Sequence, residues 1–154
     1  MIDAKRRTLV KGSLAAGAVV GAGLMAPRAF ADWNAAAFQA KDIPTAMTGL
    51  LGSDSAEVSD RIKIKAPDIA ENGAVVPVTV ETDLEGVTSI SIIASKNQTP
   101  LIASFEFVDP SVIPFVSTRI KMAETADVIA VVKAGDKLYK NAKNVKVTIG
   151  GCGG

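Results

Sequence analysis

The chain of 154 residues contains no histidine. Histidine is the usual general base of Ser-His and Cys-His catalysis and the commonest protein ligand for metal ions. Its absence also excludes zinc sites built from cysteine and histidine. Carboxylate-only metal sites stay possible, but no acidic cluster has a recognisable metal-ligand spacing. We therefore expect no metal and no other cofactor, and we do not expect an enzyme.

Cysteine is almost absent as well, because Cys152 is the only one. A single thiol excludes an internal disulfide. A structural cysteine is usually buried, yet Cys152 lies between the glycine pairs Gly150-Gly151 and Gly153-Gly154. Glycine has no Cβ and visits φ values on both sides of zero, so this pentapeptide has little reason to adopt one conformation. We interpret it as a flexible arm that carries a reactive thiol.

Residues 1–31 have the three-part layout of an export signal. A basic region that contains Arg6 and Arg7 precedes an apolar stretch rich in glycine and alanine. A small-x-small triplet then predicts cleavage between Ala31 and Asp32. Removal of this signal leaves 12 basic and 15 acidic residues, a net charge of −3. Without a strongly basic patch, nucleic acid is not an expected partner.

The arginine pair resembles that of a twin-arginine signal, although Lys5 stands where that motif prefers serine or threonine. The apolar stretch, residues 12–26, is short for a transmembrane helix, which needs about 20 residues. We therefore expect export to the periplasm by the twin-arginine route, with no membrane anchor. An ordinary secretory signal and an uncleaved anchor are the alternatives.

Beyond the signal, the hydrophobic period is first helical and then alternating. Residues 32–58 predict a helix to about Lys41 and a second one through Leu51, with Pro44 interrupting them. We expect this helical segment to lie on one end of a sheet. The sheet residues, 59–149, form one domain with it.

Short runs of alternating apolar and polar residues, separated by turn residues, fill the rest of the chain and predict seven or eight strands of an all-β, antiparallel sandwich. The continuous apolar run 128–132 is typical of a central strand. Pro77 has no backbone N–H to donate to a neighbouring strand, which predicts an edge strand or a bulge at this position. We expect turns at residues 71–73 and 141–144, among others. The alternating residues are Ile62, Ile64, Val76, Val78, Val80, Ile90, Ile92, Ala94, Ala103, Phe105, Phe107, Val116, Thr118, Ile120, Val145, Val147 and Ile149.

The thiol of Cys152 lacks an activating neighbour in the sequence. The nearest cationic residue is Lys146, six positions away, so we expect a thiol pKa near the unperturbed value of about 8.5. Only a few per cent is then thiolate at pH 7. A thiol that its own protein does not activate is typical of a group carrier. Such a carrier supplies the atom to which a group is attached, and its partner enzymes catalyse the reactions of that group.

The Gly-Gly-Cys-Gly-Gly tail of residues 150–154, behind a twin-arginine signal, a helical segment and a set of short strands, resembles the SoxY family of the periplasmic sulfur-oxidation (Sox) system. The resemblance covers essentially the whole chain and implies an immunoglobulin-like sandwich. It implies that Cys152 becomes covalently linked to thiosulfate or other reduced sulfur species. It also implies a heterodimer with a SoxZ-like subunit, and haem-containing, hydrolytic and sulfane-oxidising Sox enzymes that process the adduct in turn.

Three other interpretations compete with this one. The first takes Gly153-Gly154 as the carrier group, as in ubiquitin-like sulfur carriers, but those need ATP and a different strand pattern. The second is a lipid anchor on Cys152, for which a prenylation box is missing. The third is a structural or adaptor β-sandwich whose Cys152 forms intermolecular disulfides.

Overall fold

The computed structural model describes residues 34–150. Two helices, α2 (Ala35–Gln39) and α3 (Ile43–Leu51), come first in this part of the chain. Nine strands follow them: β1 (Glu57–Val58), β2 (Ile62–Lys65), β3 (Ile69–Asn72), β4 (Val76–Thr82), β5 (Val87–Ala94), β6 (Leu101–Glu106), β7 (Phe115–Ile120), β8 (Ala126–Ala134) and β9 (Lys137–Ile149).

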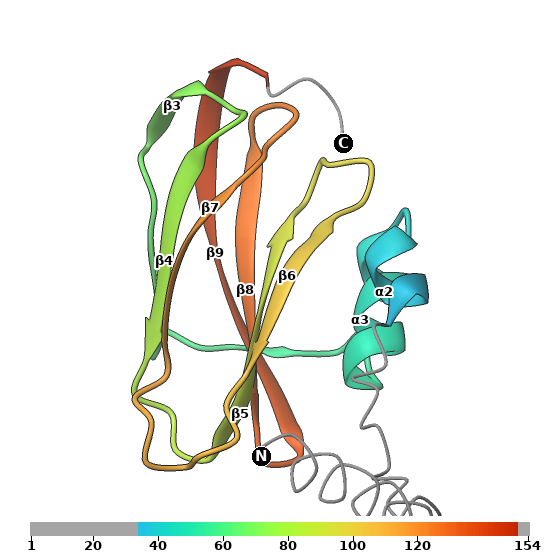
Figure 1. The fold of residues 1–154 in the computed structure, drawn as a ribbon, viewed down its shortest axis with the longest axis vertical. Coiled ribbons are helices and arrows are strands. Elements are labelled where there is room, and N and C mark those ends of the chain that lie inside the picture. The colour runs from blue at the N-terminus through green and yellow to red at the C-terminus, as the bar shows by residue number, and fades with distance from the viewer. Residues whose placement is uncertain (1–33, 151–154) are drawn as a thin grey trace, which may run out of the picture. The chain divides into compact units, whose positions relative to one another are not determined.

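The strands form two sheets that pack face to face (Figure 1). The larger sheet has the order β1-β9-β8-β5-β6, with β3 also paired to β9, and the smaller sheet has the order β2-β4-β7. This arrangement confirms the predicted all-β sandwich. It also places β8, which contains the apolar run 128–132, between β9 and β5 in the middle of the larger sheet, as predicted.

The side chains that alternate along the strands fill the space between the two sheets. Ile92 of β5, Val128 of β8 and Val78 of β4 are among the residues that are almost completely buried there. Because the side-chain period of a strand is two, a slip of one residue would turn each of these sets towards solvent. The alternation therefore determines the register of the main strands.

Two short strands depart from the predicted antiparallel pairing. β1 and β3 both run parallel to β9, β1 beside Tyr139 and Lys140, and β3 beside the segment from Lys146 to Ile149. Between β1 and β3 the chain forms β2, which belongs to the smaller sheet. The paired positions advance from Tyr139 to Ile149, so the chain follows one edge of β9 in a single direction and pairs with it before and after β2.

One predicted turn is displaced and another is wrong. The turn expected at residues 71–73 joins β3 to β4 one to two residues later, from Asn72 to Val75, because Glu71 and Asn72 still belong to β3. Residues 141–144 lie inside β9, which continues through 13 residues. The side chains of Asn141 and Lys143 donate hydrogen bonds to the carbonyl oxygens of Ile62 and Ala66, each at 2.7 Å. In the sequence, these polar residues favour the prediction of a turn. In the structure, their side chains instead hydrogen-bond β9 to the segment around β2.

The prediction of an edge strand at Pro77 is also wrong. Pro77 lies in β4, which is the middle strand of the smaller sheet. However, β2 pairs only with residues from Thr79 to Thr82 of β4, whereas β7 pairs with β4 from Val76 onwards. Pro77 therefore lies beyond the end of β2, at a place where β4 has one neighbour.

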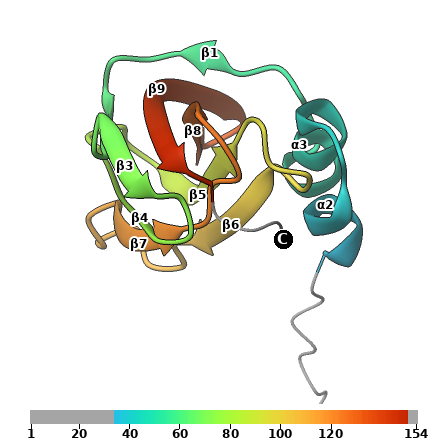
Figure 2. The same cartoon turned by 90° about the horizontal axis from the view of Figure 1, so that it is seen from above.

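The helices cover the outer face of the larger sheet rather than one end of it, which corrects the expectation (Figure 2). Three of their side chains, together with Ala40 directly after α2, pack on residues of β5, β6, β8 and β9 and form a second apolar layer. As a result, both faces of β5 and β8 are buried. The buried residues of this layer are Ala37, Ala40, Ala46, Met47, Ile93, Leu101, Val131 and Leu138.

Capping residues determine where the helices begin and end. The Asp42 carboxylate accepts a hydrogen bond of 2.8 Å from the backbone N–H of Thr45 at the start of α3, which lowers the pKa of Asp42. Pro44 lies in the first turn, where its missing N–H leaves no bond unmade. Gly52 ends the helix with a φ of 82°, a left-handed conformation that favours glycine.

We expect the inter-sheet core to carry most of the stability. Replacing Ile92, which is 0% exposed, by alanine should lower the free energy of unfolding by about 2–5 kcal/mol, because it leaves a cavity between the sheets. Ile113→Ala is the matched control, since Ile113 is 80% exposed and its truncation should change stability by less than about 0.5 kcal/mol. Urea unfolding followed by circular dichroism measures both values, and equal losses would contradict this assignment of the core.

Candidate functional site

Gly150 is the one predicted site residue that lies within the described part of the chain. As predicted, β9 ends at Ile149, and Gly150 follows it directly. The other predicted site residues lie outside the described residues; they are Arg6, Arg7, Ala31, Asp32, Gly151, Cys152, Gly153 and Gly154. The site must therefore be built from the end of the sandwich at which β9 stops.

One side of the β9 end is bonded to the turn that joins β3 and β4. The carbonyl oxygen of Ile149 accepts a hydrogen bond of 2.8 Å from the N–H of Gly73. The carbonyl oxygen of Gly73 in turn accepts one of 2.7 Å from the N–H of Met122. The hydroxyl of Thr148 donates to the carbonyl oxygen of Glu71 at 3.0 Å. The last two residues of β9 are thereby tied to a neighbouring turn.

The other side of the β9 end is bonded to the loop between β7 and β8. The hydroxyl oxygen of Thr125 accepts a hydrogen bond of 2.9 Å from the N–H of Val147. Asn97, in the turn between β5 and β6, fastens this loop to the sandwich. Its side-chain oxygen accepts from the N–H of Ala123 at 2.9 Å, and its amide nitrogen donates to the carbonyl oxygen of Lys121 at 2.7 Å.

Gly150 packs closely against the loop that Asn97 holds. A Cβ atom on Gly150 would overlap with the carbonyl oxygen of Ala123. That oxygen belongs to a backbone that cannot move aside without breaking the bonds to Asn97. In this conformation, packing therefore leaves no room for a side chain at position 150, a reason for glycine that is independent of backbone flexibility.

We define the exit face as Ile149, Gly150 and the three neighbouring segments 73–75, 95–98 and 121–124. These segments gather at the end of the sandwich where β9 stops (Figure 1). Lys96, Lys121 and Glu124 are exposed on this face. None of these three side chains takes part in the ion pairs found within residues 34–150. Two large apolar side chains are also exposed there, Val75 at 54% and Ile149 at 69%.

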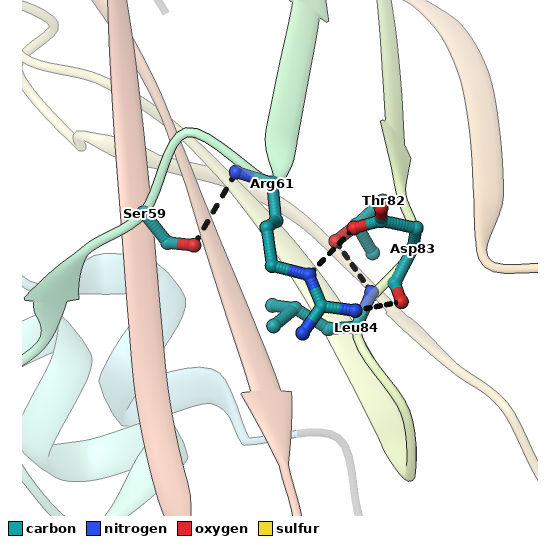
Figure 3. Close-up of polar contacts among 5 residues, drawn as sticks. All are labelled: Ser59, Arg61, Thr82, Asp83 and Leu84. Carbon is teal, nitrogen blue, oxygen red and sulfur yellow. Dashed lines mark hydrogen bonds and ion pairs between the residues drawn. The ribbon is translucent and has the colours of Figure 1, made fainter.

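The opposite end of the sandwich carries an ion pair between Arg61 and Asp83 (Figure 3). The Nε atom of Arg61 donates to the Asp83 carboxylate at 2.8 Å, and the guanidinium also donates to the Asp83 carbonyl oxygen. The side-chain hydrogen bond from Arg61 lowers the pKa of Asp83. Both side chains are exposed, so solvent screens the pair and it contributes little to stability.

Two hollows of the surface lie away from the exit face. One adjoins the Arg61–Asp83 pair and is lined partly by Ile113 and Phe115. The other lies between the end of α3 and the ends of β5, β6 and β8, beside Glu106 and Lys133. Neither hollow is lined by a residue that the sequence analysis connected with function.

The described residues offer no assembled site for a metal or a buried polar ligand. Within residues 34–150, no three acidic, histidine or cysteine side chains are placed to hold a metal ion. Every buried side-chain nitrogen or oxygen in this part of the chain has a hydrogen-bond partner. No helix formed by these residues is both long and apolar enough to cross a membrane.

Sequence reasoning missed the residues that hold this face. Asn97 lies in a stretch that is readily predicted to be a turn, but a turn pattern does not say which distant backbone its side chain reaches. Thr125 and Gly73 carry no signal of their own beyond the common preference of such residues for loops. Their partners lie far away in the sequence, so only the packing of three loops reveals them.

A family model described as "Sulfur oxidation protein SoxY" matches residues 47–152. Among solved structures, the sulfur carrier protein SoxY from Chlorobium limicola f thiosulfatophilum is similar to this chain, with 48% identity and a TM-score of 0.64 over 72% of this chain and 96% of that chain. A superoxide reductase (neelaredoxin) from Ignicoccus hospitalis shares the fold alone, with 16% identity and a TM-score of 0.53 over 60% of this chain and 94% of that chain. No curated protein matches the chain.

Replacing Gly150 by alanine should destabilise the exit face. The new Cβ must displace the backbone at Ala123, and such overpacking typically costs about 1–3 kcal/mol of unfolding free energy. Gly49→Ala is the control, because the Cβ there meets Ala37 at an ordinary 3.4 Å and a glycine inside a helix is unfavourable by about 0.5–1 kcal/mol. Thermal unfolding should therefore move in opposite directions for the two variants. A Gly150→Ala protein as stable as the wild type would contradict the close packing.

Replacing Thr125 by valine keeps the shape of the side chain but removes the hydroxyl that bonds the N–H of Val147. The loss of a hydrogen bond of about 0.5–1.5 kcal/mol should speed hydrogen exchange of the Val147 amide roughly two- to tenfold. The amide of Ala130, in the middle of β8, should exchange at the wild-type rate. Amide exchange followed by NMR tests this, and equal acceleration at both amides would mean that the loss is global.

Proposed function

Since this chain belongs to the SoxY family of sulfur oxidation proteins, we propose that it is a periplasmic sulfur carrier that binds intermediates of thiosulfate oxidation on Cys152. The observation that supports this most directly is the extent of the family match, which reaches Cys152 itself. The similar Chlorobium protein is described as a sulfur carrier. Cys152 is also the only thiol in this chain to which sulfur could be attached.

The first step of the proposed cycle couples the Cys152 sulfur to the sulfane sulfur of thiosulfate. A new S–S bond forms, the thiol proton goes to solvent, and two electrons pass to a haem-containing partner enzyme. A hydrolytic partner then adds water to the sulfonate sulfur and breaks its bond to the sulfane sulfur. Sulfate and two protons leave, and a persulfide anion remains on Cys152. A sulfane-oxidising partner acts on that persulfide next.

In this proposal the chain itself is not a catalyst. It contains no histidine that could act as a general base, and Lys146, the nearest cation in sequence, lies within β9. Activation of the thiol must then come from the site of each partner enzyme. The chain contributes the attachment atom on a short glycine arm and the rigid end of β9 to which that arm is joined.

The same family resemblance supports a heterodimer with a SoxZ-like subunit. The twin-arginine features of residues 1–31 support export to the periplasm, a route that carries folded proteins and so suits joint export of two subunits. The competing function is an adaptor sandwich that uses Cys152 only for intermolecular disulfides. The two functions differ in what becomes attached to the thiol.

Replacing Cys152 by serine should abolish sulfur loading and leave the thermal unfolding temperature unchanged, because the body of the sandwich ends before this residue. Mass spectrometry of the tail peptide, after incubation of the chain with thiosulfate and the partner enzymes, measures the loading. The wild-type peptide should carry a mass increase that a reductant removes. A wild-type peptide found only as a disulfide between two chains would favour the adaptor instead.

A further inference from the structure

We propose that the exit face is the surface on which the hydrolytic partner enzyme docks when it acts on sulfur held by Cys152. This inference rests on the proposed carrier function and adds to it the place and the chemistry of the contact. It starts from the anchored position of Gly150, which packs against the backbone of Ala123 at the end of β9.

The covalent chain limits how far the thiol can travel from that anchor. Cys152 follows Gly150 by two residues. A fully extended chain spans at most about 3.3–3.6 Å per residue, so the Cα atom of Cys152 stays within about 7 Å of the Cα atom of Gly150. An enzyme whose reactive centre meets the sulfur on Cys152 must therefore approach the sandwich to a similar distance.

At that distance the enzyme touches more than the tail. A specific protein–protein interface buries roughly 800 Å² on each partner, far more than a few glycines and one cysteine offer. The remaining contact must come from the surface around the anchor. The residues available there are the exposed parts of segments 73–75, 95–98 and 121–124.

The exit face has an apolar side and a charged side. Val75 and Ile149 form the apolar side and are joined through Asn72, which pairs with Ile149 in the β3–β9 register and whose carbonyl oxygen accepts a hydrogen bond from the N–H of Val75. Lys96 and Lys121 lie on the other side, where Asn97 connects their two loops, together with one exposed acidic side chain, Glu124.

This distribution determines the kind of partner that fits. The rim of its active-site opening should bear apolar side chains opposite Val75 and Ile149. It should bear carboxylates opposite Lys96 and Lys121, because complementary charge speeds association and orients the two proteins. The glycines of the tail present no side chains that would obstruct a narrow opening.

A second exposed apolar group, at Val108, Ile113 and Phe115, lies at the other end of β7 from the exit face. Phe115 begins β7, whereas Ile120 ends that strand next to the exit face. Six residues of a strand span roughly 20 Å, well beyond the reach of a tail that extends about 7 Å from Gly150. This distant group therefore provides matched controls for the exit face.

The test compares substitutions of the same chemical kind at the two ends of the full chain. At the exit face these are Val75→Asp and the double variant Lys96→Glu with Lys121→Glu. At the far end they are Ile113→Asp and the double variant Lys133→Glu with Lys137→Glu. The readout is kcat/KM for a purified hydrolytic partner enzyme, with the carrier as its substrate after Cys152 has been loaded with a thiosulfonate group.

We expect each exit-face change to lower kcat/KM about tenfold or more, with the charge reversal losing its effect as salt screens the rim. The far-end changes should stay within about twofold of the wild type. Alkylation of Cys152 by neutral iodoacetamide should proceed at the wild-type rate in every variant, because this small probe needs no docking. Thermal unfolding should confirm that all variants are folded.

Three results would overturn the inference. Wild-type kcat/KM in both exit-face variants would show that the hydrolytic enzyme does not bind this surface. Larger losses at the far end would place the docking surface elsewhere. A loss of iodoacetamide reactivity that parallels the loss of turnover would attribute the effect to access to the thiol. A wild-type chain that never carries a sulfur adduct would instead contradict the proposed function itself, and mass spectrometry separates that failure from the other three.

Discussion

The position from which the cysteine-bearing tail leaves the protein depends on the hydrogen bond between the N–H of Gly73 and the carbonyl oxygen of Ile149. This bond holds the last residue of β9, and the loop fastened by Asn97 closes on Gly150 from the other side. Two independent loops thus define one point on the surface. The sandwich beneath them supplies the rigidity, because its two apolar layers bury both faces of β5 and β8.

A fixed anchor changes how a carrier of this kind must work. A long tether would let the thiol visit enzymes with little regard for the body that bears it. Here Cys152 follows Gly150 by two residues, which limits the distance between their Cα atoms to about 7 Å. An enzyme that reaches the thiol must therefore also come close to the sandwich, against which Gly150 packs. Under the proposed carrier function, recognition by the partner enzyme and delivery of the sulfur therefore take place in one contact; the sequence and structural similarity itself shows membership of the SoxY family.

The accuracy of the sequence prediction varied with how local each signal was. Period-two alternation identified the main strands, and a continuous apolar run identified residues 128–132 as a central strand. Both signals are local, because the burial of one or both faces of a strand is visible in the order of neighbouring residues. The turn-residue signal failed at residues 141–144, where the side chains of Asn141 and Lys143 bond carbonyl oxygens far away in the chain instead of making a turn. The edge-strand prediction at Pro77 failed for a different reason. The strand that contains Pro77 is a middle strand, but β2 ends before it reaches Pro77, so the proline has a neighbouring strand on one side only.

The sequence by itself determined the all-β sandwich and the two helices before it, and it contains a single thiol, that of Cys152, which is the proposed attachment atom. These follow from composition and from short-range patterns, which need no knowledge of the partners of each residue. Only the tertiary structure decided that β1 and β3 run parallel to β9, that the helices cover a sheet face, and that Asn97, Gly73 and Ala123 surround Gly150. Those facts depend on contacts between loops that are distant along the chain, and chain proximity carries no information about them.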